Sequence, residues 1–244
     1  MQEAGRLVGE VLTELAAHVA PGVSTADLDA LAEKRIVAAG AIPAFKGYHG
    51  YPATICASIN EEVIHGIPSG RRVLAEGDVI SIDVGAELDG YFGDSAISLP
   101  VGKVSEQAAT LLRVTEESLY KAIERVRPGG RVSDIGHAVQ KHVEAFGFSV
   151  VRDFVGHGIG EQMHEEPQVP NYGEPGRGPR LAEGMVLAIE PMVNAGKPAV
   201  KVLADGWTAV TKDGSLAAHF EHTVAVTSGE PRILTARVPV AHAL

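Results

Sequence analysis

The sequence predicts an α+β protein with a two-layer α/β architecture. A curved antiparallel or mixed sheet would carry helices on its outer face and a polar centre on its inner face. Helix and strand patterns recur as helix, helix, strands, twice along the 244 residues. Segments 74–83 (LAEGDVISID) and 181–190 (LAEGMVLAIE) both begin with LAEG and end in an acid. Segment 79–95 has the pattern of a β-hairpin, with turn residues Glu87–Gly90 between two apolar strands.

The matching segments lie at one constant offset, because 107 residues separate Asp83 from Glu190. The same offset aligns other residue pairs: Pro21-Gly22 with Pro128-Gly129, Asp27 with Asp134, and Gly40 with Gly147. Two copies are too few for a solenoid, so the repeat predicts one pseudo-two-fold domain over residues 1–244. Its halves would be roughly 1–104 and 105–244. Equivalent strand ends would then bring Asp83 and Glu190 together across the axis.

Composition excludes several classes of protein. The net charge is −10 and no basic run exceeds Arg71-Arg72, which argues against nucleic acid as a direct partner. Cys56 is the single cysteine, so an intrachain disulfide is impossible and a reducing compartment fits. No apolar stretch is long enough to span a membrane, and the first residues lack a signal-peptide pattern. We therefore expect a cytoplasmic protein without a membrane partner.

Four helices are expected from apolar periodicity and from capping signals. Leu7, Val11, Leu15 and Val19 recur at spacing four, which predicts a one-sided helix over 5–20. Ser24, with an acid three residues later, predicts the start of a second helix that ends at Gly40. Segments 105–127 and 133–146 have the patterns of a third and a fourth helix.

Short β-prone runs separated by turn residues predict the strands. Besides the hairpin at 79–95, we expect strands at 55–59, 148–154, 185–193, 200–203, 207–211 and 217–227. Strands 200–203 and 207–211 would form a second hairpin around Asp205-Gly206. Segments 61–70 and 171–180 are expected to be loops, the second because it is rich in Pro and Gly.

Four acids lie inside these apolar strand patterns, two in each half. Each alone fits a bland structural role, such as a strand-end carboxylate in water. Four carboxylates that converge without a cation would repel one another severely, so the combination predicts divalent metal ions. His157, between glycines that allow close backbone approach, is a fifth candidate ligand. The predicted ligands are Asp83, Asp94, His157, Glu190 and Glu221, an oxygen-rich set that suits Mn, Fe(II) or Co and tolerates Zn.

Sequence motifs along nearly the whole chain resemble those of the type I methionine aminopeptidases, metallopeptidases with the pita-bread fold. The motifs that carry the resemblance are GYHGYP at 47–52, HGIP at 65–68, SIDVG at 81–85, GDS at 93–95, GHGIG at 156–160, MHEEP at 163–167, AIEPMVNAG at 188–196, DGWT at 205–208 and FEHT at 220–223. The resemblance implies a catalytic domain that hydrolyses the peptide bond after the initiator methionine when the second residue is small. Its partners would be the N-termini of nascent polypeptides at the ribosome.

The resemblance also implies roles for the predicted ligands. Asp94 and Glu221 would bridge two divalent ions, Asp83 would hold one of them, and His157 and Glu190 the other. Glu190 would also take a proton from the attacking water and pass it to the leaving amine. His65 and His164 would line the site, His164 next to the carbonyl oxygen and His65 near the amide of the second residue.

The implied methionine pocket is apolar and adaptable, which suits a thioether side chain. Its residues would be Phe45, Tyr48, Tyr51, Cys56, Met163 and Trp207, with His65 and His164 at its edge. Departures from the family pattern are Phe45 in place of a common cysteine, Met163 in place of a common Phe, Glu161 where a basic or neutral residue is frequent, and a start close to the first helix. Some relatives bind a monovalent cation through backbone carbonyls near Asn60, and backbone ligands leave no sequence signal.

Two alternatives remain open at this level. An Xaa-Pro aminopeptidase or prolidase shares the five-ligand pattern, although it usually carries a further N-terminal domain and lacks the aromatic GYHGYP passage. A non-catalytic pita-bread module that binds peptides is a second alternative, although such modules typically lose several of the ligands. Monomers are the habit of the aminopeptidase family.

Overall fold

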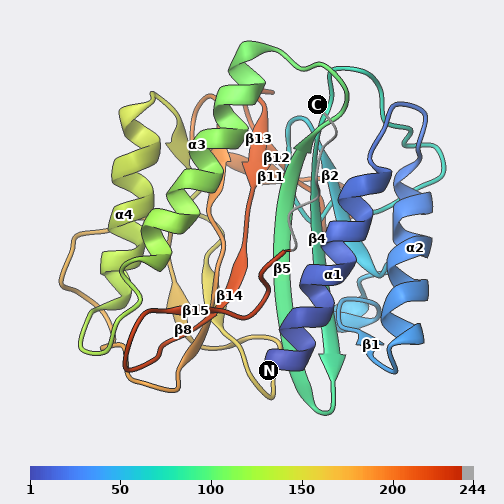
Figure 1. Ribbon diagram of the computed structural model, residues 1–244. Coiled ribbons are helices and arrows are strands. Elements are labelled where there is room, and N and C mark those ends of the chain that lie inside the picture. The colour runs from blue at the N-terminus through green and yellow to red at the C-terminus, as the bar shows by residue number, and fades with distance from the viewer. Residues whose placement is uncertain (238–244) are drawn as a thin grey trace.

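The helices form one layer of the molecule, and most of the strands lie behind it (Figure 1). This computed structural model describes residues 1–237. Within them the α-helices are α1 (Gln2–His18), α2 (Thr25–Ala38), α3 (Glu106–Ile123) and α4 (Val132–Ala145), and η1 (Tyr48–Gly50) is a single 3₁₀ turn. The predicted arrangement of helices on the outer face is confirmed.

The strands of the described residues are short, except for one long hairpin. They are β1 (Ile42–Pro43), β2 (Ile55–Ile59), β3 (Glu62–Ile64), β4 (Val79–Leu88), β5 (Tyr91–Pro100), β6 (Ser149–Val150), β7 (Gly156–Gly158), β8 (Glu165–Val169), β9 (Val186–Ile189), β10 (Met192–Asn194), β11 (Val200–Val202), β12 (Ala209–Thr211), β13 (Ala217–His219), β14 (His222–Ala225) and β15 (Arg232–Ile233). The predicted hairpin is β4–β5, with Asp89 and Gly90 at positive φ in its turn.

The same order of strands occurs in both halves of the chain. In the first half β4 lies between β5 and β2, and in the second half β9 lies between β14 and β7. All these pairings are antiparallel. The two segments that begin with LAEG, 74–83 and 181–190, lead into the central strands β4 and β9. Residues 107 positions apart in the sequence therefore occupy equivalent places in the two sheets.

Aspartates at equivalent positions begin the second helix of each half. The Ser24 N–H donates to Asp27 Oδ2 at 3.0 Å, and the Asp27 N–H donates back to Ser24 Oγ at 3.2 Å, which completes a capping box. In the other half the Arg131 N–H donates to Asp134 Oδ2 at 2.8 Å. These bonds satisfy backbone groups that a helix end would otherwise leave open. The predicted helix starts near 25 and 133 are therefore confirmed.

Several predicted boundaries are wrong. The first helix begins at Gln2 rather than Gly5, and the third ends at Ile123, five residues before Pro128. The predicted loop 61–70 contains β3, and the predicted strand 148–154 shrinks to β6. In both places the pairing partner is distant in sequence, β12 for β3 and β10 for β6, so a local pattern gives little signal.

The two predicted acid-bearing strands are each interrupted at the acid. Segment 185–193 divides into β9 and β10 at Glu190-Pro191, and segment 217–227 divides into β13 and β14 at Phe220-Glu221. Pro191 has no N–H to donate to a ladder. The Glu221 N–H leaves the ladder to donate to the carbonyl of Ala96 at 3.0 Å. The interruptions allow both glutamates to turn out of their sheets.

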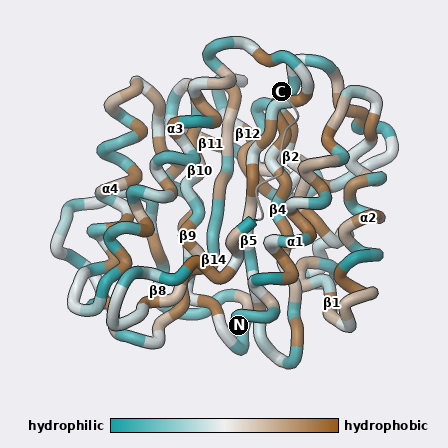
Figure 2. Tube along the Cα trace, viewed as in Figure 1, coloured by the Kyte–Doolittle hydropathy of each residue, from teal (hydrophilic) through white to brown (hydrophobic). Residues whose placement is uncertain are grey.

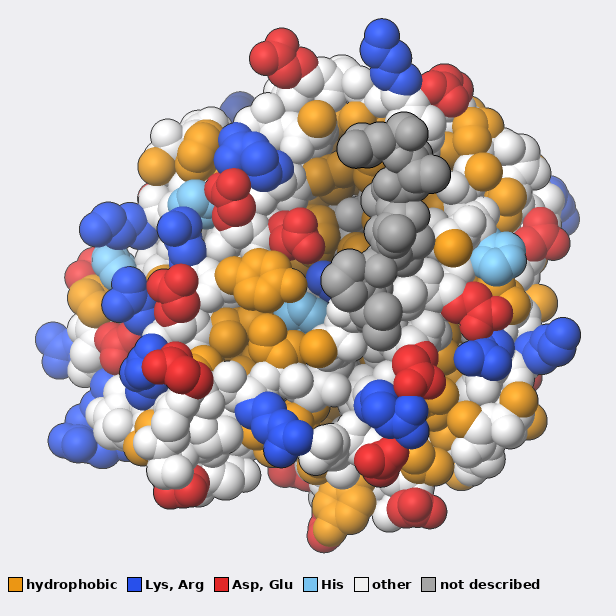
Figure 3. All heavy atoms as spheres, in the orientation of Figure 1, with side chains coloured by type: hydrophobic (Ala, Val, Ile, Leu, Met, Phe, Trp, Pro, Cys, Tyr) orange, Lys and Arg blue, Asp and Glu red, His pale blue; other side chains and the backbone are white. Residues whose placement is uncertain are grey.

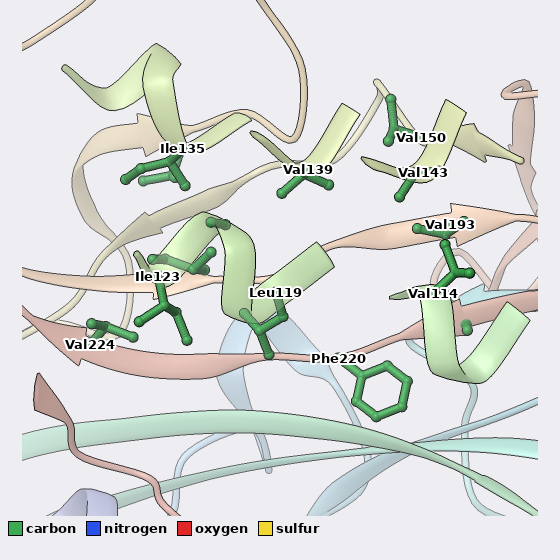
Figure 4. Close-up of a cluster of buried hydrophobic side chains, with 14 of the residues drawn as sticks. Val114, Leu119, Ile123, Ile135, Val139, Val143, Val150, Val193, Phe220 and Val224 are labelled. Atoms are coloured by element: carbon green, nitrogen blue, oxygen red, sulfur yellow. The ribbon is translucent and has the colours of Figure 1, made fainter. Parts of the chain in front are cut away.

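Each pair of helices covers its own hydrophobic cluster. Leu12, Leu28 and Ile82 are among the residues buried where α1 and α2 pack on β4. Leu119, Val139, Val224 and others form the cluster beneath α3 and α4, and these side chains point toward one another between the helices and the strands (Figure 4). Hydrophilic and hydrophobic residues alternate along the helices, as expected for helices buried on one side only (Figure 2).

Charged side chains of both signs share the helix-bearing face (Figure 3). Arg113 and Glu117 pair at 2.8 Å along α3, and Arg127 pairs with Glu230 at 2.8 Å. Exposed pairs of this kind contribute little to stability. Across residues 1–237, each helix is too short or too polar to span a lipid bilayer.

The buried cluster under α3 and α4 gives a stability prediction. Leu119 is 0% exposed, so Leu119→Ala is expected to lower the free energy of unfolding by about 2–5 kcal/mol, since the cavity cannot fully collapse. Leu203 is 40% exposed, and Leu203→Ala is the matched control with an expected change below about 0.5 kcal/mol. Urea unfolding followed by circular dichroism measures both. Equal losses for the two variants would contradict this assignment of the core.

Candidate active site

Asp83 points away from the helices because of the alternation along β4. Its neighbours Ile82 and Val84 are fully buried in the cluster beneath α1 and α2. Successive side chains of a strand point to opposite faces, so Asp83 lies on the inner face. Cys56 of β2 is directly opposite it in the register. The sheet thus presents a carboxylate and a thiol side by side on the face that bears no helix.

Asp94 and Glu221 come from different halves and are joined through their backbones. Thr223 Oγ1 donates to the carbonyl of Asp94 at 2.7 Å and accepts from the Asp94 N–H at 3.1 Å. Ser95 Oγ donates to the carbonyl of Glu221 at 2.5 Å. These bonds fix the two acidic residues relative to one another, so both carboxylates reach the same buried place.

His157 sits on β7 between two glycines whose backbones lie against other strands. A Cβ on Gly156 would lie 2.3 Å from the carbonyl oxygen of Ala188, and one on Gly158 would lie 2.3 Å from that of Glu166. The predicted close approach is therefore present. His157 Nδ1 bonds the carbonyl of Gly158 at 2.8 Å and so carries the proton, which leaves Nε2 as a free acceptor. Its Nε2 is 4.0 Å from Asp94 Oδ2 and 3.7 Å from Glu190 Oε1.

The five predicted ligands meet in one place. Ligand atoms of Asp94, His157 and Glu221 all lie within 4.8 Å of one another. Burial raises the pKa of Asp94 to about 7, and burial with neighbouring carboxylates raises the pKa values of Asp83, Glu190 and Glu221 well above their usual range.

Three oxygens of this cluster are buried without a protein partner in the described part of the chain. Asp83 Oδ1, Asp94 Oδ1 and Glu221 Oε1 are buried and have no hydrogen-bond partner among the described residues. Buried polar atoms are otherwise nearly always satisfied. Four carboxylates and one imidazole with a free Nε2 fit divalent cations in both charge and donor type. The residues present therefore fit the metal ions that the sequence predicts.

The cluster lies at the floor of a cavity of about 240 Å³. Every site residue predicted from the sequence lines this cavity: Phe45, Tyr48, Tyr51, Cys56, His65, Asp83, Asp94, His157, Met163, His164, Glu190, Trp207 and Glu221. Their individual roles stay predictions. His49 also lines the cavity and was missed, although it stands in the GYHGYP passage between two predicted residues.

One wall of the cavity is apolar. Phe45, Tyr51, Cys56 and Met163 are buried in one small cluster, against which the partly buried Trp207 packs. The rings of Tyr51 and Trp207 meet edge to face with centroids 5.2 Å apart. Tyr51 Oη donates to the carbonyls of Ile55 and Gly66 at 3.0 and 3.1 Å, so its polar tip is satisfied outside the cavity. The wall offers aromatic faces and sulfur atoms to a ligand.

Neutral histidines line the other walls. Burial lowers the pKa values of His65 and His157 to about 4, and it also lowers that of His164. His164 Nδ1 is 2.8 Å from Tyr48 Oη, and its ring centroid is 4.3 Å from that of His157. His65 packs edge to face near Phe154 and Trp207. At neutral pH these imidazoles are uncharged, and each can donate one hydrogen bond and accept another without adding charge to the cavity.

Comparisons with known proteins show the family of this chain. Residues 1–228 match the model of metallopeptidase family M24. A methionine aminopeptidase of Clostridium acetobutylicum is 60% identical over 235 residues, which cover 96% of this chain and 94% of that protein. The crystal structure of a methionine aminopeptidase from Thermotoga maritima superposes with a TM-score of 0.96 at 48% identity, covering 97% of this chain and 95% of that one.

A more distant likeness shows the fold alone. A prolidase from Pyrococcus horikoshii superposes with a TM-score of 0.76 at 22% identity, and the match covers 97% of this chain but 61% of the prolidase. The pita-bread fold predicted from the motifs is confirmed by these structures. The high-identity relatives are aminopeptidases, which favours that activity over the prolidase alternative. The chain belongs to metallopeptidase family M24 and, within it, to the methionine aminopeptidases.

Proposed function

We propose that this chain removes the initiator methionine from nascent polypeptides whose second residue is small. The observation that carries the proposal is the contact between two environments in one cavity. An apolar wall of aromatic rings and sulfur atoms stands directly beside a buried cluster of four carboxylates and a histidine. A methionine side chain suits the first environment, and hydrolysis of the adjoining peptide bond needs the second.

The cluster would hold two divalent ions. Asp94 and Glu221 would contact both ions, Asp83 would hold one of them, and His157 and Glu190 would hold the other. When bound, the ions would neutralise the carboxylates, polarise the scissile carbonyl and activate water. The donor set favours Mn, Fe(II) or Co and also accepts Zn.

Glu190 is our candidate for the residue that moves the proton. Its carboxylate lies beside His157 in the assigned ligand set, where it would take a proton from the attacking water and pass it to the leaving amine. His65 lines the same cavity and would lie near the amide of the second residue. Its imidazole is neutral because of burial, so it would hydrogen-bond there without repelling a leaving amine that gains charge.

His164 is our candidate for stabilising the carbonyl oxygen. Tyr48 Oη lies 2.8 Å from its Nδ1. When the phenol donates to Nδ1, the imidazole carries its proton on Nε2, and that N–H is free to donate to the oxyanion that develops during attack.

We further propose that the enzyme acts as a monomer in the cytoplasm, where nascent N-termini leave the ribosome.

Methionine release is the first test. Metal-stripped protein is incubated with Met-Ala-Ser, with Ala-Pro peptides as the comparison, and Mn, Fe(II), Co or Zn is added back in turn. We expect metal-dependent release of methionine from Met-Ala-Ser and at least about 100-fold slower cleavage of the Ala-Pro peptides, a difference of about 2.7 kcal/mol in activation free energy. Preference for Ala-Pro peptides would support the prolidase alternative instead. Folded protein without activity under any metal would favour the peptide-binding module.

Substitution of one bridging carboxylate tests the assigned ligands without relying on activity. Asp94→Asn is expected to reduce bound Mn²⁺ below one ion per chain, because the amide removes a charge and a ligand oxygen. Asp89→Asn, in the exposed hairpin turn where Asn also tolerates positive φ, is the matched control and should bind as the unchanged protein does. Isothermal titration calorimetry measures both. Full metal binding by Asp94→Asn would remove Asp94 from the ligand set.

The raised pKa of Asp94 gives a pH prediction for the metal-free protein. The folded state holds its proton up to about pH 7, whereas the unfolded chain releases it near the ordinary value of 3.8. The folded state therefore holds this proton between these values, so the contribution of Asp94 to stability should fall as pH rises from about 4 to about 7. The buried histidines with lowered pKa values contribute in the opposite direction, so the contribution of Asp94 is read as a difference between two proteins. Urea unfolding of the unchanged protein and of Asp94→Asn at pH 5 and pH 7.5 measures it: the stability of the unchanged protein relative to Asp94→Asn should be lower at pH 7.5 than at pH 5, and added Mn²⁺ should raise the stability of the unchanged protein at pH 7.5.

Met163 gives a specificity prediction. It is buried in the apolar wall, and Met163→Phe exchanges a flexible thioether for a rigid ring. Competition between peptides that begin with Met, Leu or norleucine should shift by about 3-fold or more, while kcat for Met-Ala-Ser changes less than that. An unchanged specificity profile would remove Met163 from the pocket.

A further inference from the structure

His219 is a buried imidazole next to the site that none of the assigned roles uses. Its side chain is 3% exposed, and its Nε2 has no hydrogen-bond partner among the described residues. The atom that Nε2 faces is Oε2 of Glu190, 3.6 Å away. A buried polar atom without a partner destabilises a fold unless a bound state satisfies it. The environment of His219 therefore points to Glu190.

The carboxylate of Glu190 lies between two imidazoles. Its Oε1 is 3.7 Å from Nε2 of His157, and its Oε2 is 3.6 Å from Nε2 of His219. His157 lines the cavity and belongs to the assigned ligand set, whereas His219 does neither. One oxygen of Glu190 therefore faces the proposed metal centre, and the other faces the protein interior. A donor on the interior side would fix the plane of the carboxylate.

The backbone of His219 is held in place from the other half of the chain. Ser98 Oγ on β5 donates to the carbonyl of His219 at 2.8 Å and accepts from the His219 N–H at 2.8 Å. Ser98 Oγ also bonds Ser81 Oγ on β4 at 2.7 Å. On its own sheet His219 pairs with Met192 of β10, two residues after Glu190. His219 is thus anchored on both sides, so its ring has a defined direction.

We propose that His219 is a positioning residue whose Nε2–H donates a hydrogen bond to Oε2 of Glu190 and orients that carboxylate toward the metal centre. This inference rests on the proposed function, since it deepens the role of Glu190 in the same site. The present separation of 3.6 Å is longer than a hydrogen bond, and a shift of roughly 0.7 Å brings it to the usual 2.9 Å. Side chains that orient a metal ligand in this way commonly change metal affinity or activity about 10–100-fold when they are removed.

Two substitutions separate orientation from packing. His219→Gln keeps an N–H donor at nearly the same reach, and His219→Leu keeps comparable volume without a donor. With Mn²⁺-loaded protein and Met-Ala-Ser, we expect His219→Leu to lower kcat about 10–100-fold with KM changed less than about 3-fold. His219→Gln should keep kcat within about 5-fold of the unchanged protein. The exposed residue His18, changed to Gln and to Leu, serves as the control pair.

The thermal stability of the metal-free variant distinguishes a positioning histidine from a merely structural one. Leu at position 219 removes an unpartnered buried polar atom, so the thermal midpoint of metal-free His219→Leu should be equal to or above that of the unchanged protein. Full activity of His219→Leu would overturn the proposal. Gln as impaired as Leu would also overturn it, because the imidazole itself would then be needed. If neither His219→Leu nor His219→Met folds, His219 is a structural core residue and the proposal is wrong.

Metal affinity separates this inference from the proposed function. Calorimetric titration with Mn²⁺ should show about 10-fold weaker binding of an ion to His219→Leu than to either His219→Gln or the unchanged protein. Unchanged protein that releases no methionine would contradict the proposed function, and the titration would still decide the role of His219. Equal Mn²⁺ affinity in all three proteins, together with equal kcat, would leave His219 without a positioning role.

Discussion

The structure depends on one electrostatic constraint, which is that four carboxylates are buried within reach of one another. Burial raises the pKa values of all four carboxyl groups, and repulsion by neighbouring carboxylates raises those of Asp83, Glu190 and Glu221 further. Such a cluster is stable as charged groups only with cations among them. A fold that assembles it must hold the acids rigidly, because a flexible site would relax by turning the side chains out to water.

Rigidity comes from bonds that cross between the halves rather than from the helices. Ser95 Oγ holds the carbonyl of Glu221, and Thr223 Oγ1 holds both backbone groups of Asp94. The Glu221 N–H donates to the carbonyl of Ala96. The helices cover the opposite face and supply apolar burial there (Figure 1). The acids lie on one face of the sheets and the two hydrophobic clusters lie on the other, beneath the helices. This separation allows an acidic centre and well-packed apolar clusters in the same fold.

Features encoded locally could be predicted from the sequence. The turn of the hairpin β4–β5 and the cap at Ser24 depend on neighbours within four residues, and both were predicted. Four of the five candidate ligands stand out in the sequence because an acid inside an apolar strand is visible there and recurs in both halves, and the fold brings them together with His157, although their role as ligands stays a prediction. What could not be predicted depends on distant partners. The breaks at Glu190 and Glu221 and the short strand β3 are fixed by contacts with remote segments.

His49 and His219 show the same limit at the site. His49 stands inside the GYHGYP motif, and His219 lies just before FEHT, but neither position has a spacing that by itself marks a site residue. Only the fold brings His49 to the cavity wall, and only the fold turns Nε2 of His219 toward Glu190. Their environment, rather than their identity, makes them candidates.

The size of the cavity supports an enzyme that works from a chain end. About 240 Å³ is below the 300–1,000 Å³ usual for small-molecule pockets, and part of that space borders the acidic cluster. Tyr51, Met163 and Trp207 belong to the apolar cluster that forms another part of its lining. A polypeptide that threaded through would need an opening on both sides of the scissile bond. An apolar wall next to the proposed metal centre suits a single terminal residue, and this is the physical basis on which we propose selection of an N-terminal methionine over an internal one.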